Sequence, residues 1–448
     1  MEYILPPIGL FRPRMKTTSW MLRSLLLLGI LSGSWGHEKM KNIYSWKSLE
    51  FAFPSEEARD AAIHEGRFIP GKLAPIDTDV YVAEHKKPIV FITIPRFQEG
   101  VPVTLGYVSD DATLDGNPLI VPYPNWEYNT LGNCDSITSV YRIQVDKCGR
   151  LWVLDTGKHI EEQICPPQLL VFCLKSNKLL SQYKFSQDFY KDTSIFVTPI
   201  VDTRGPKCQD TFVYIADVAG FALIVYDHNT GSAWKIVNNL FYPYPTDGTF
   251  HIHGDTFDLM DGILGLALSP IKPNGDRILY FHSLASRVES WVSTSIIRNA
   301  TLFHDNPEAA PRSFKPFALK RETQSAAEAM DRNGVLFFGL LSDISIGCWN
   351  SKHYPQYGGN NIEVVAKNQE RLQFPSGMKV ITDTNGRQEL WTMTSSFQRV
   401  MIGTINPNET NFRIEAGYVD ELVRGTKCDV ASLNVQNSRV RPGTHLGK

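Results

Sequence analysis

The sequence predicts an all-β fold, a six-bladed β-propeller, from three observations. A short strand centred on an aromatic residue recurs six times, at intervals of roughly 60 residues. Three copies follow an Asn-Gly pair, which tolerates positive φ at both central positions of a tight hairpin turn. Each interval holds several short strands, as propeller blades do. The six aromatic residues are Phe91, Trp152, Tyr214, Tyr280, Phe337 and Trp391.

Residues 1–36 are predicted to be a secretory signal peptide. Basic residues precede the apolar run 25–31, and residues 34–36 place small side chains at both positions that define a cleavage site. The apolar run is too short to span a bilayer as a helix. We therefore expect a secreted, extracellular protein without membrane association. Two sequons predict glycosylation in that compartment, at Asn299 and Asn408.

Residues 37–75 form a lead-in to the ring. In this segment Ser55 precedes an acidic, alanine-rich stretch and Gly66 follows it, which predicts a short capped helix. Residues 76–430 hold the six blades. We expect the N-terminal strand to complete the last blade and close the ring. Residues 431–448 carry few large apolar side chains, so we expect a disordered tail.

The second repeat shows how one blade is built. Residues 140–145 alternate between apolar and polar side chains, as an inner strand does. Residues 151–155 return antiparallel to them, and residues 168–174 form the third strand. The third repeat follows the same order through residues 211–217 and 221–226. The pattern therefore predicts antiparallel strands throughout.

Composition and motifs exclude several classes of protein. The net charge is −2, which gives no electrostatic basis for binding nucleic acid. The motifs of common hydrolases, proteases and nucleotide-binding enzymes are missing from the sequence. His251 and His253, with Asp255 nearby, suggest a metal pair, but a histidine pair in a loop is more often structural. We predict no metal and no cofactor.

Seven cysteines fit an oxidising compartment, and the odd number leaves at least one without a partner in the chain. Cys134 precedes the inner strand of the second repeat and Cys165 follows its second strand. Both fall on one rim, so we expect them to pair. A bond between Cys348 and Cys428 would join the fifth repeat to the chain end. The pairing of the others is open, with Cys148–Cys173 as one alternative; they are Cys148, Cys173 and Cys208.

Aligning the repeats predicts a ligand site. The residues three positions after each aromatic should ring the channel mouth, and a mixed polar ring suits a small polar ligand. These residues are Ile94, Asp155, Asp217, Ser283, Leu340 and Thr394. Neighbours that would add donors and an aromatic wall are Thr156, His282, Ser342, Ser395, Ser396 and Phe397. The alternative for Asp155 and Asp217 is a turn role, with bonds to nearby backbone amides.

His282 is the best candidate for acid–base chemistry in this set. An unperturbed imidazole titrates near neutral pH, which suits proton transfer. The alternative is a buried histidine whose hydrogen bonds are satisfied, next to Phe281. Both interpretations stay open at the level of sequence.

Several segments resemble the Yellow and major royal jelly protein family of insects. They include residues 133–136, 146–157 and 261–270, and the resemblance runs from about residue 46 to residue 428. It implies a secreted, glycosylated six-bladed propeller with roles in cuticle pigmentation and melanin formation. Some members are dopachrome conversion enzymes, salivary members bind biogenic amines in the channel mouth, and royal jelly members serve as nutritional or sterol-associated proteins. One fold therefore hosts several functions.

In the amine-binding members, the last blade contributes a polar residue and a nearby phenylalanine. The resemblance places Ser395 where those members use asparagine, and it places Phe397 at the phenylalanine. The aromatic position is thus kept and the polar one differs.

Two hypotheses follow for function. The first is dopachrome conversion, an isomerisation that needs an aromatic slot, a base and donors to the developing catecholate oxygens. Phe397 would supply the slot and His282 or Asp217 the base. The donors would be Ser283, Thr394 and Ser395. The second is a non-catalytic binder of catecholamines or indoles, with Asp155 or Asp217 facing the ammonium, or a structural protein of the cuticle matrix.

Overall fold

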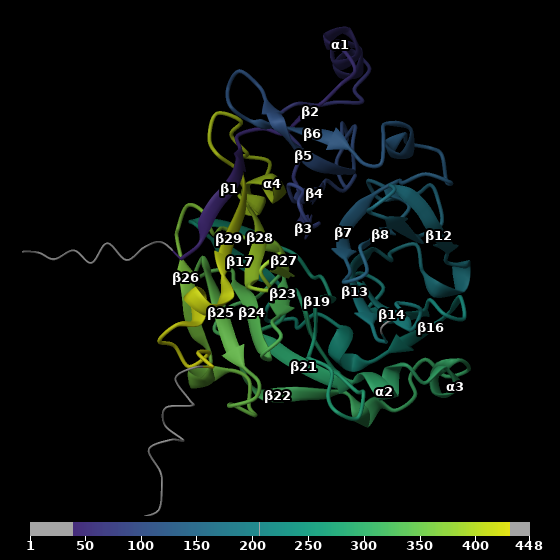
Figure 1. The fold of residues 1–448 in the computed structure, drawn as a ribbon, viewed down its shortest axis with the longest axis vertical. Helices are drawn as coiled ribbons and strands as arrows, with labels where there is room; N and C mark the ends of the chain where they lie inside the picture. The colour runs from purple at the N-terminus through teal and green to yellow at the C-terminus, as the bar shows by residue number, and fades with distance from the viewer. Residues whose placement is uncertain (1–38, 206, 431–448) are drawn as a thin grey trace, which may run out of the picture. The chain divides into compact units, whose positions relative to one another are not determined.

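The computed structural model describes residues 39–205 and 207–430. In that part of the chain, six sheets surround a central axis, so the fold is a six-bladed β-propeller as predicted. Each blade has four antiparallel strands, and the sheet of blade 1 gains a short fifth strand in parallel. Figure 1 shows the blades in chain order around the ring. The predicted signal peptide (1–36) and the predicted tail (431–448) lie outside the described residues.

Each blade runs from an inner strand at the channel to an outer strand at the rim. Blade 1 comprises β3 (Asp77–Tyr81), β4 (Ile89–Thr93), β5 (Leu105–Ala112) and β6 (Pro118–Pro122). Blade 2 comprises β7 (Val140–Val145), β8 (Arg150–Asp155), β11 (Gln168–Cys173) and β12 (Lys178–Lys184). Blade 3 comprises β13 (Phe196–Thr203), β14 (Thr211–Asp217), β15 (Ala222–Asp227) and β16 (Ser232–Val237).

The second half of the ring repeats this plan. Blade 4 comprises β19 (Ile263–Leu268), β20 (Ile278–Ser283), β21 (Val288–Ser293) and β22 (Lys315–Lys320). Blade 5 comprises β23 (Glu328–Met330), β24 (Val335–Leu340), β25 (Ser345–Asn350) and β26 (Glu363–Lys367). Blade 6 comprises β27 (Pro375–Thr382), β28 (Gln388–Ser395), β29 (Phe412–Tyr418) and β1 (Lys41–Trp46).

The repeated aromatics all lie in second strands, where they fill the space between blades. Each is less than a tenth exposed. Trp152 of blade 2, for example, packs in one hydrophobic cluster with Val213 and Ile215 of blade 3. The Asn-Gly pairs form the turns between first and second strands, and Gly334 has a φ of 85° that suits glycine. The sequence repeat therefore corresponds to the inner hairpin of each blade.

The N-terminal lead-in closes the ring. β1 pairs antiparallel with β29, and Figure 1 shows the purple strand beside the yellow one. β2 (Glu50–Phe51) pairs parallel with β6 of blade 1. Trp46 is fully buried, and its Nε1 donates to the carbonyl oxygen of Pro118 at 2.8 Å. The lead-in thus ties the last blade to the first.

Short helices and hairpins decorate the ring. The predicted helix is α1 (Glu56–His64), capped by Ser55, whose Oγ accepts from the amide of Ala58. The other helices are α2 (Thr294–Ile297), α3 (Ala300–Phe303), α4 (Phe397–Met401) and α5 (Val419–Val423). Two small hairpins are β9 (Lys158–His159) with β10 (Glu162–Gln163), and β17 (Thr249–Ile252) with β18 (Asp255–Asp258). Within residues 39–205 and 207–430, no helix has the length and apolarity that a membrane span requires.

The structure forms three disulfides. Cys134 bonds to Cys165 and Cys348 bonds to Cys428, as the sequence predicted. The open pairing is resolved as Cys148–Cys208, which joins the inner turns of blades 2 and 3 and leaves Cys173 as the free thiol. The alternative Cys148–Cys173 bond is not formed. Both sequon asparagines, at positions 299 and 408, are exposed, and their glycosylation stays a prediction.

Candidate functional site in the central channel

A single arginine plugs the central channel. Arg142, on the inner strand of blade 2, is only 4% exposed. Its Nη1 donates to Thr198 Oγ1 at 2.7 Å and to the carbonyl of Leu264 at 3.3 Å. Its Nη2 donates to the carbonyls of Ala326 at 2.9 Å and Ser376 at 2.7 Å. One side chain therefore links blade 2 to blades 3, 4, 5 and 6.

β-Bulges supply two of these carbonyls. The pairing of β19 with β20 shifts register around Leu264, and the pairing of β27 with β28 shifts around Ser376. A bulge leaves its extra residue outside the ladder, so that residue's carbonyl needs another donor. The guanidinium carries five donors in a rigid fork and can serve several carbonyls at once. Burial lowers the pKa of Arg142 to about 10, so it stays protonated at neutral pH.

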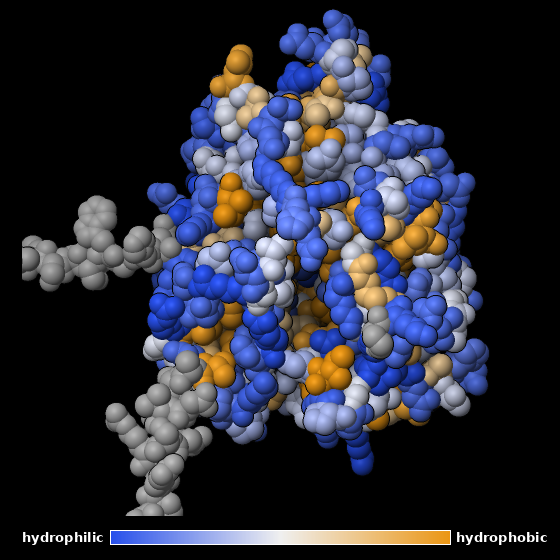
Figure 2. Space-filling model, in the orientation of Figure 1, coloured by the Kyte–Doolittle hydropathy of each residue, from blue (hydrophilic) through white to orange (hydrophobic). Residues whose placement is uncertain are grey.

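A cavity of about 150 Å³ lies beside Arg142 and is lined by the inner strands of all six blades. It extends toward the inner turns, since residues near the ends of these strands line it. Figure 2 shows the ring hollowed near its centre, with apolar side chains inside the hollow. The charged residues that line the cavity are Asp79, Arg142, Arg277, Glu328 and Lys379.

Two of the cations in this cavity are paired outside it. Lys379 Nζ lies 2.7 Å from both carboxylate oxygens of Asp77, and Arg277 Nη1 lies 3.0 Å from Asp202 Oδ1. Asp79 accepts from two backbone amides, and burial raises its pKa to about 7. The cavity thus presents three cations beside carboxyl groups that are easily protonated.

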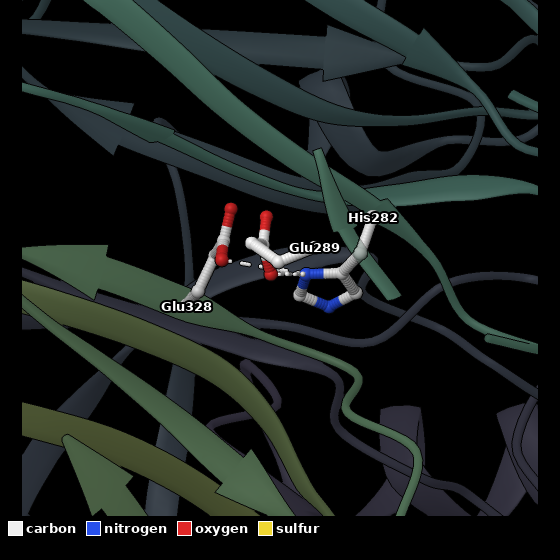
Figure 3. Close-up of side chains that lie close together, drawn as sticks. All are labelled: His282, Glu289 and Glu328. Atoms are coloured by element: carbon white, nitrogen blue, oxygen red, sulfur yellow. Dashed lines mark hydrogen bonds and ion pairs between the residues drawn. The ribbon is translucent and has the colours of Figure 1, made fainter. Parts of the chain in front are cut away.

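Glu328 connects the cavity to a buried polar cluster between blades 4 and 5. His282 Nδ1 lies 3.0 Å from Glu289 Oε2 and 3.3 Å from Glu328 Oε2, as Figure 3 shows. Arg321 Nη1 donates to Glu289 Oε2 at 2.7 Å and to the hydroxyl of Tyr357 at 2.9 Å. All five residues are at most 5% exposed. We call these five residues the interblade cluster.

The pKa values in the interblade cluster are strongly perturbed. Burial and the charge of Glu289 raise the pKa of Glu328 to about 7. Burial raises the pKa of Glu289, but His282 and Arg321 outweigh it and the net pKa is lowered. Burial and Arg321 lower the pKa of His282, yet the two carboxylates prevail and the net pKa is raised. An imidazolium between two glutamates is therefore favoured.

A glycine makes room for the His282 ring. Gly265 on β19 faces the imidazole, and a Cβ at that position would lie 2.2 Å from the ring's Cε1. Such an approach is available only to glycine without movement of the ring. The Gly265 backbone therefore fixes the plane of the imidazole against β19.

The other end of the channel is crossed by the β17–β18 hairpin. This hairpin lies in the chain between blades 3 and 4, yet it packs against α4 of blade 6 on the opposite side of the ring. Phe257 of the hairpin contacts Phe397 with ring centroids 6.1 Å apart, and Phe397 stacks on Phe374 at 4.3 Å. Asp255 lies 3.6 Å from Arg399. Aromatic packing therefore covers the end where the sequence predicted a mouth.

The predicted acidic residues lie one strand away from the channel, at the ends of second strands. Asp155 accepts from the amides of Thr138 and Ser139, and Asp217 accepts from Ser194 Oγ and the amide of Ile195. These partners lie in the loops that lead into the inner strands. The prediction that the residues three positions after each aromatic ring the channel mouth is wrong. They lie on second strands, and the inner strands stand between them and the channel.

The predicted hydroxyl donors mostly serve the backbone. Ser283 Oγ donates to the carbonyls of Phe241 and Tyr242, and Thr394 Oγ1 donates to that of Arg371. Thr156 Oγ1 accepts from the amide of Phe196, and Ser342 is exposed. Ser395 is the exception, because its buried Oγ has no hydrogen-bond partner among the described residues. Ser395 is the last residue of β28, and Phe397 begins α4 two residues later.

The sequence singled out His282 as an acid–base candidate, a role that stays a prediction, but it did not single out the two carboxylates beside it. Glu289 and Glu328 lie on different blades, and each sits in a strand that reads as ordinary alternation. Arg142 lies in the alternating strand of residues 140–145 and was not predicted as a site residue. A usable signal was Gly265, since a glycine inside a buried strand indicates close approach of another group.

These features define a class of protein: a six-bladed propeller whose channel is plugged by an arginine and holds a polar cavity. The family model "Major royal jelly protein" matches residues 138–428. Protein yellow of Drosophila melanogaster is 33% identical over 424 residues, which covers 92% of this chain and 74% of the relative. Major royal jelly protein 9 of Apis mellifera is 37% identical over 402 residues, 87% of this chain and 90% of the relative. The chain belongs to the major royal jelly protein family, which includes these Yellow relatives.

Two solved structures resemble this chain at low sequence identity. A streptogramin B lyase structure covers 78% of this chain and 94% of its own, at a TM-score of 0.39 and 11% identity. A virginiamycin B lyase from Staphylococcus aureus, an inactive variant with quinupristin, covers 78% and 96% at a TM-score of 0.38 and 13% identity. No functional argument follows from likeness at this level.

Proposed function

We propose that this protein is a secreted member of its family that acts in pigmentation by converting dopachrome to a dihydroxyindole in the central cavity. The Yellow resemblance supports the biological setting. When the carboxylate is kept, the reaction is an isomerisation in which each proton that leaves a ring carbon is matched by one taken up at a quinone oxygen. When the carboxylate is lost, carbon dioxide leaves in place of one ring-carbon proton, its bonding electrons stay in the ring, and one quinone oxygen takes its proton from solvent. The proposal requires no metal and no organic cofactor.

The observation that carries this proposal is the set of charges around the cavity. Arg142, Arg277 and Lys379 line the cavity together with Asp79 and Glu328, whose carboxyl groups have pKa values raised to about 7. Lys379 and Arg277 are also paired with Asp77 and Asp202, so protonation of Asp79 or Glu328 makes the surroundings of the cavity more positive, which favours an anionic ligand such as the carboxylate of dopachrome. The volume of about 150 Å³ lies below the roughly 300–1,000 Å³ of drug-sized sites, so the ligand is small.

The cavity also supplies what the chemistry needs. Cations close to a quinone oxygen stabilise the negative charge that develops there, and a low-dielectric site strengthens that effect. A carboxyl group with a pKa near neutral is suited to accept a proton at physiological pH. Asp217, one of the two bases considered from sequence, is held by Ser194 and the backbone, away from this cavity.

The direct test is turnover of dopachrome by the purified mature protein, followed by loss of its absorbance and by chromatographic identification of the product. Wild-type protein should exceed the buffer blank. Ala329→Phe fills the cavity and should abolish the excess, whereas the exposed control Ala112→Phe should retain it. Circular dichroism and thermal melting establish that both variants fold. A wild-type rate equal to the blank would overturn the proposal.

A second candidate function is binding of an aromatic amine at the covered end of the channel. It is favoured by the unpartnered Oγ of Ser395 beside the stacked pair of Phe374 and Phe397. Calorimetry with dopamine, serotonin and tyramine distinguishes the two functions. Micromolar binding that is lost in Phe397→Ala and accompanied by no dopachrome turnover would favour the binder. Absence of both binding and turnover would favour a structural role in the cuticle matrix.

A further inference from the structure

We propose that Arg277, Gln144 and Lys379 form a carboxylate-binding end of the central cavity, and that Arg277 makes the site selective for ligands that carry one carboxylate. This inference rests on the proposed function in one respect: it names the class of substrate that the same cavity accepts. The binding that it describes is measurable without turnover.

Arg277 reaches the cavity with its side chain. It directly precedes β20, a second strand, so its main chain lies one strand away from the channel. The side chain is 17% exposed and lines the cavity. Nε donates to the carbonyl of Ser269 at 2.5 Å and Nη1 to Asp202 Oδ1 at 3.0 Å, whereas Nη2 has no hydrogen-bond partner within residues 39–205 and 207–430. Both hydrogens of Nη2 are therefore left for a ligand.

Gln144 and Lys379 add donors from two other blades. Gln144, on β7 of blade 2, accepts from the amide of Val201 at 2.6 Å through Oε1, and its Nε2 has no partner in the described part of the chain. Lys379, on β27 of blade 6, is 16% exposed, and its Nζ lies 2.7 Å from Asp77 Oδ1. Blades 2, 4 and 6 therefore each bring one donor group to the same cavity.

The side-chain oxygens around the cavity are occupied or covered. Each carboxylate oxygen of Asp79 accepts from a backbone amide, and Thr198 Oγ1 accepts from Arg142. The side chain of Glu328 has no exposed area. Among the side chains that line the cavity, the strong hydrogen-bonding groups left for a ligand are donors. Such a set matches a carboxylate, which only accepts.

The surroundings of Arg277 hold more positive than negative charge. Arg277 and Arg204 share the fully buried carboxylate of Asp202, at 3.0 and 2.8 Å. The other carboxylate near Arg204 is Asp210, which is 60% exposed and lies 3.9 Å away. Solvent screens an exposed partner at that distance. Two guanidiniums therefore face one buried carboxylate, which leaves one positive charge for an anionic ligand.

The rest of the cavity limits the ligand to one negative charge. Lys379 is paired with Asp77, and Arg142 donates only to neutral groups among the described residues. Burial raises the pKa values of Asp79 and Glu328 to about 7, so together they carry roughly one negative charge at neutral pH. That charge offsets Arg142, and the excess at Arg277 remains. A monoanion is therefore balanced in this cavity and a dianion is not.

The first experiment measures binding without turnover. Indoline-2-carboxylate, its uncharged amide and inorganic sulfate are each titrated into the purified mature protein by calorimetry. The carboxylate should bind, and the amide should bind at least roughly 10-fold more weakly, because it loses the charge-assisted contacts. Equal affinity for the amide, tighter binding of sulfate, or no binding of the carboxylate would each overturn the inference.

Arg277→Met tests the assignment of the selective residue. Asp202 keeps Arg204 and the hydroxyl of Tyr214 as partners, so the variant should fold, which thermal melting establishes. It should bind indoline-2-carboxylate at least roughly 10-fold more weakly than wild type, whereas the exposed control Arg312→Met should bind it equally well. Wild-type affinity in folded Arg277→Met would overturn the assignment.

Gln144→Glu tests the same site from the opposite blade and decides the question if Arg277→Met is poorly folded. The substitution keeps an oxygen for the amide of Val201 and replaces the Nε2 donor by a carboxylate oxygen. It should weaken binding of indoline-2-carboxylate at least roughly 10-fold, because a donor is lost and a like charge is added. Unchanged affinity would exclude Gln144 from the site.

Turnover separates this inference from the proposed function. Dopaminechrome has the ring system of dopachrome without the carboxylate. Wild-type protein should show the lower KM for dopachrome, and Arg277→Met should raise that KM roughly 10-fold while the KM for dopaminechrome stays near the wild-type value. Equal KM values in wild type would overturn the selectivity and leave the proposed function standing. Binding of indoline-2-carboxylate without turnover of either compound would overturn the proposed function and support the site.

Discussion

Replacing Arg142 by methionine is the most informative perturbation of this ring. Methionine has a similar length but carries no donors, so the carbonyls of Leu264, Ala326 and Ser376 lose their shared partner. The substitution changes only the centre of the channel and leaves every blade's own ladder in place. It therefore isolates how much the plug contributes to holding the blades together.

The magnitude follows from the contacts. Each buried carbonyl left without a donor costs roughly 1–3 kcal/mol, so three cost roughly 3–9 kcal/mol at most. Removing the buried charge of Arg142 offsets part of this loss of stability. The pKa of Arg142 falls from 12.5 to about 10, which corresponds to roughly 3 kcal/mol of unfavourable charging. We expect a net loss of roughly 3 kcal/mol in the free energy of unfolding, a large share of the roughly 5–15 kcal/mol typical of domains.

The assay is urea denaturation followed by tryptophan fluorescence, with the disulfides intact. The free energy of unfolding of Arg142→Lys should fall between those of wild type and Arg142→Met, because an ammonium keeps donors but lacks the planar fork of the guanidinium. Arg67→Met is the matched control: Arg67 and its partner Glu65 are both exposed, so the loss of this pair should leave the free energy of unfolding close to the wild-type value. A loss below about 1 kcal/mol in Arg142→Met would refute the view that the plug joins the blades.

Further expectations concern stability and reactivity. Because the pKa of Glu328 is raised to about 7, its ionisation opposes folding; the free energy of unfolding should fall as pH rises from about 4 to about 7, and Glu328→Gln should flatten that slope in denaturation curves. Replacing both Cys348 and Cys428 by serine removes a disulfide with a sequence separation of 80 and should cost roughly 4 kcal/mol, seen as a lower denaturation midpoint. Asp217→Ala orphans the amides of its loop and should lower the free energy of unfolding by about 2 kcal/mol; no change in the midpoint would contradict the structural role. Cys173 should account for the one thiol that a thiol reagent detects in native protein, and Cys173→Ser should remove that signal.

The sequence was sufficient for features that repeat along the chain. Six aromatic strands and their Asn-Gly turns predicted six blades, because each copy records the same local hairpin. The bond Cys134–Cys165 was predictable because both cysteines fall next to strands of one blade, on the same rim. The bond Cys348–Cys428 was predictable because these are the two cysteines late in the chain, and it joins blade 5 to the segment after blade 6.

Features that depend on several blades at once were not predictable. Arg142 binds backbone carbonyls, which carry no side-chain signal in the sequence. Asp155 and Asp217 lie at equivalent strand ends, as the predicted ring required. The prediction was wrong about the strand, because these ends lie one strand away from the channel. The β17–β18 hairpin covers the channel end by packing against α4 on the opposite side of the ring, and α4 is remote from the hairpin in sequence.

The pairing of β1 with β29 has a consequence for biosynthesis. Residues 41–46 are made early, yet their partners at 412–418 are among the last of the ring to be synthesised. The outer edge of blade 6 cannot form until nearly the whole chain has been translated, so closure of the ring is a late event in folding. Until then both edges are unpaired and open to wrong partners. Folding of this protein should therefore depend more on chaperones than its closed native ring suggests.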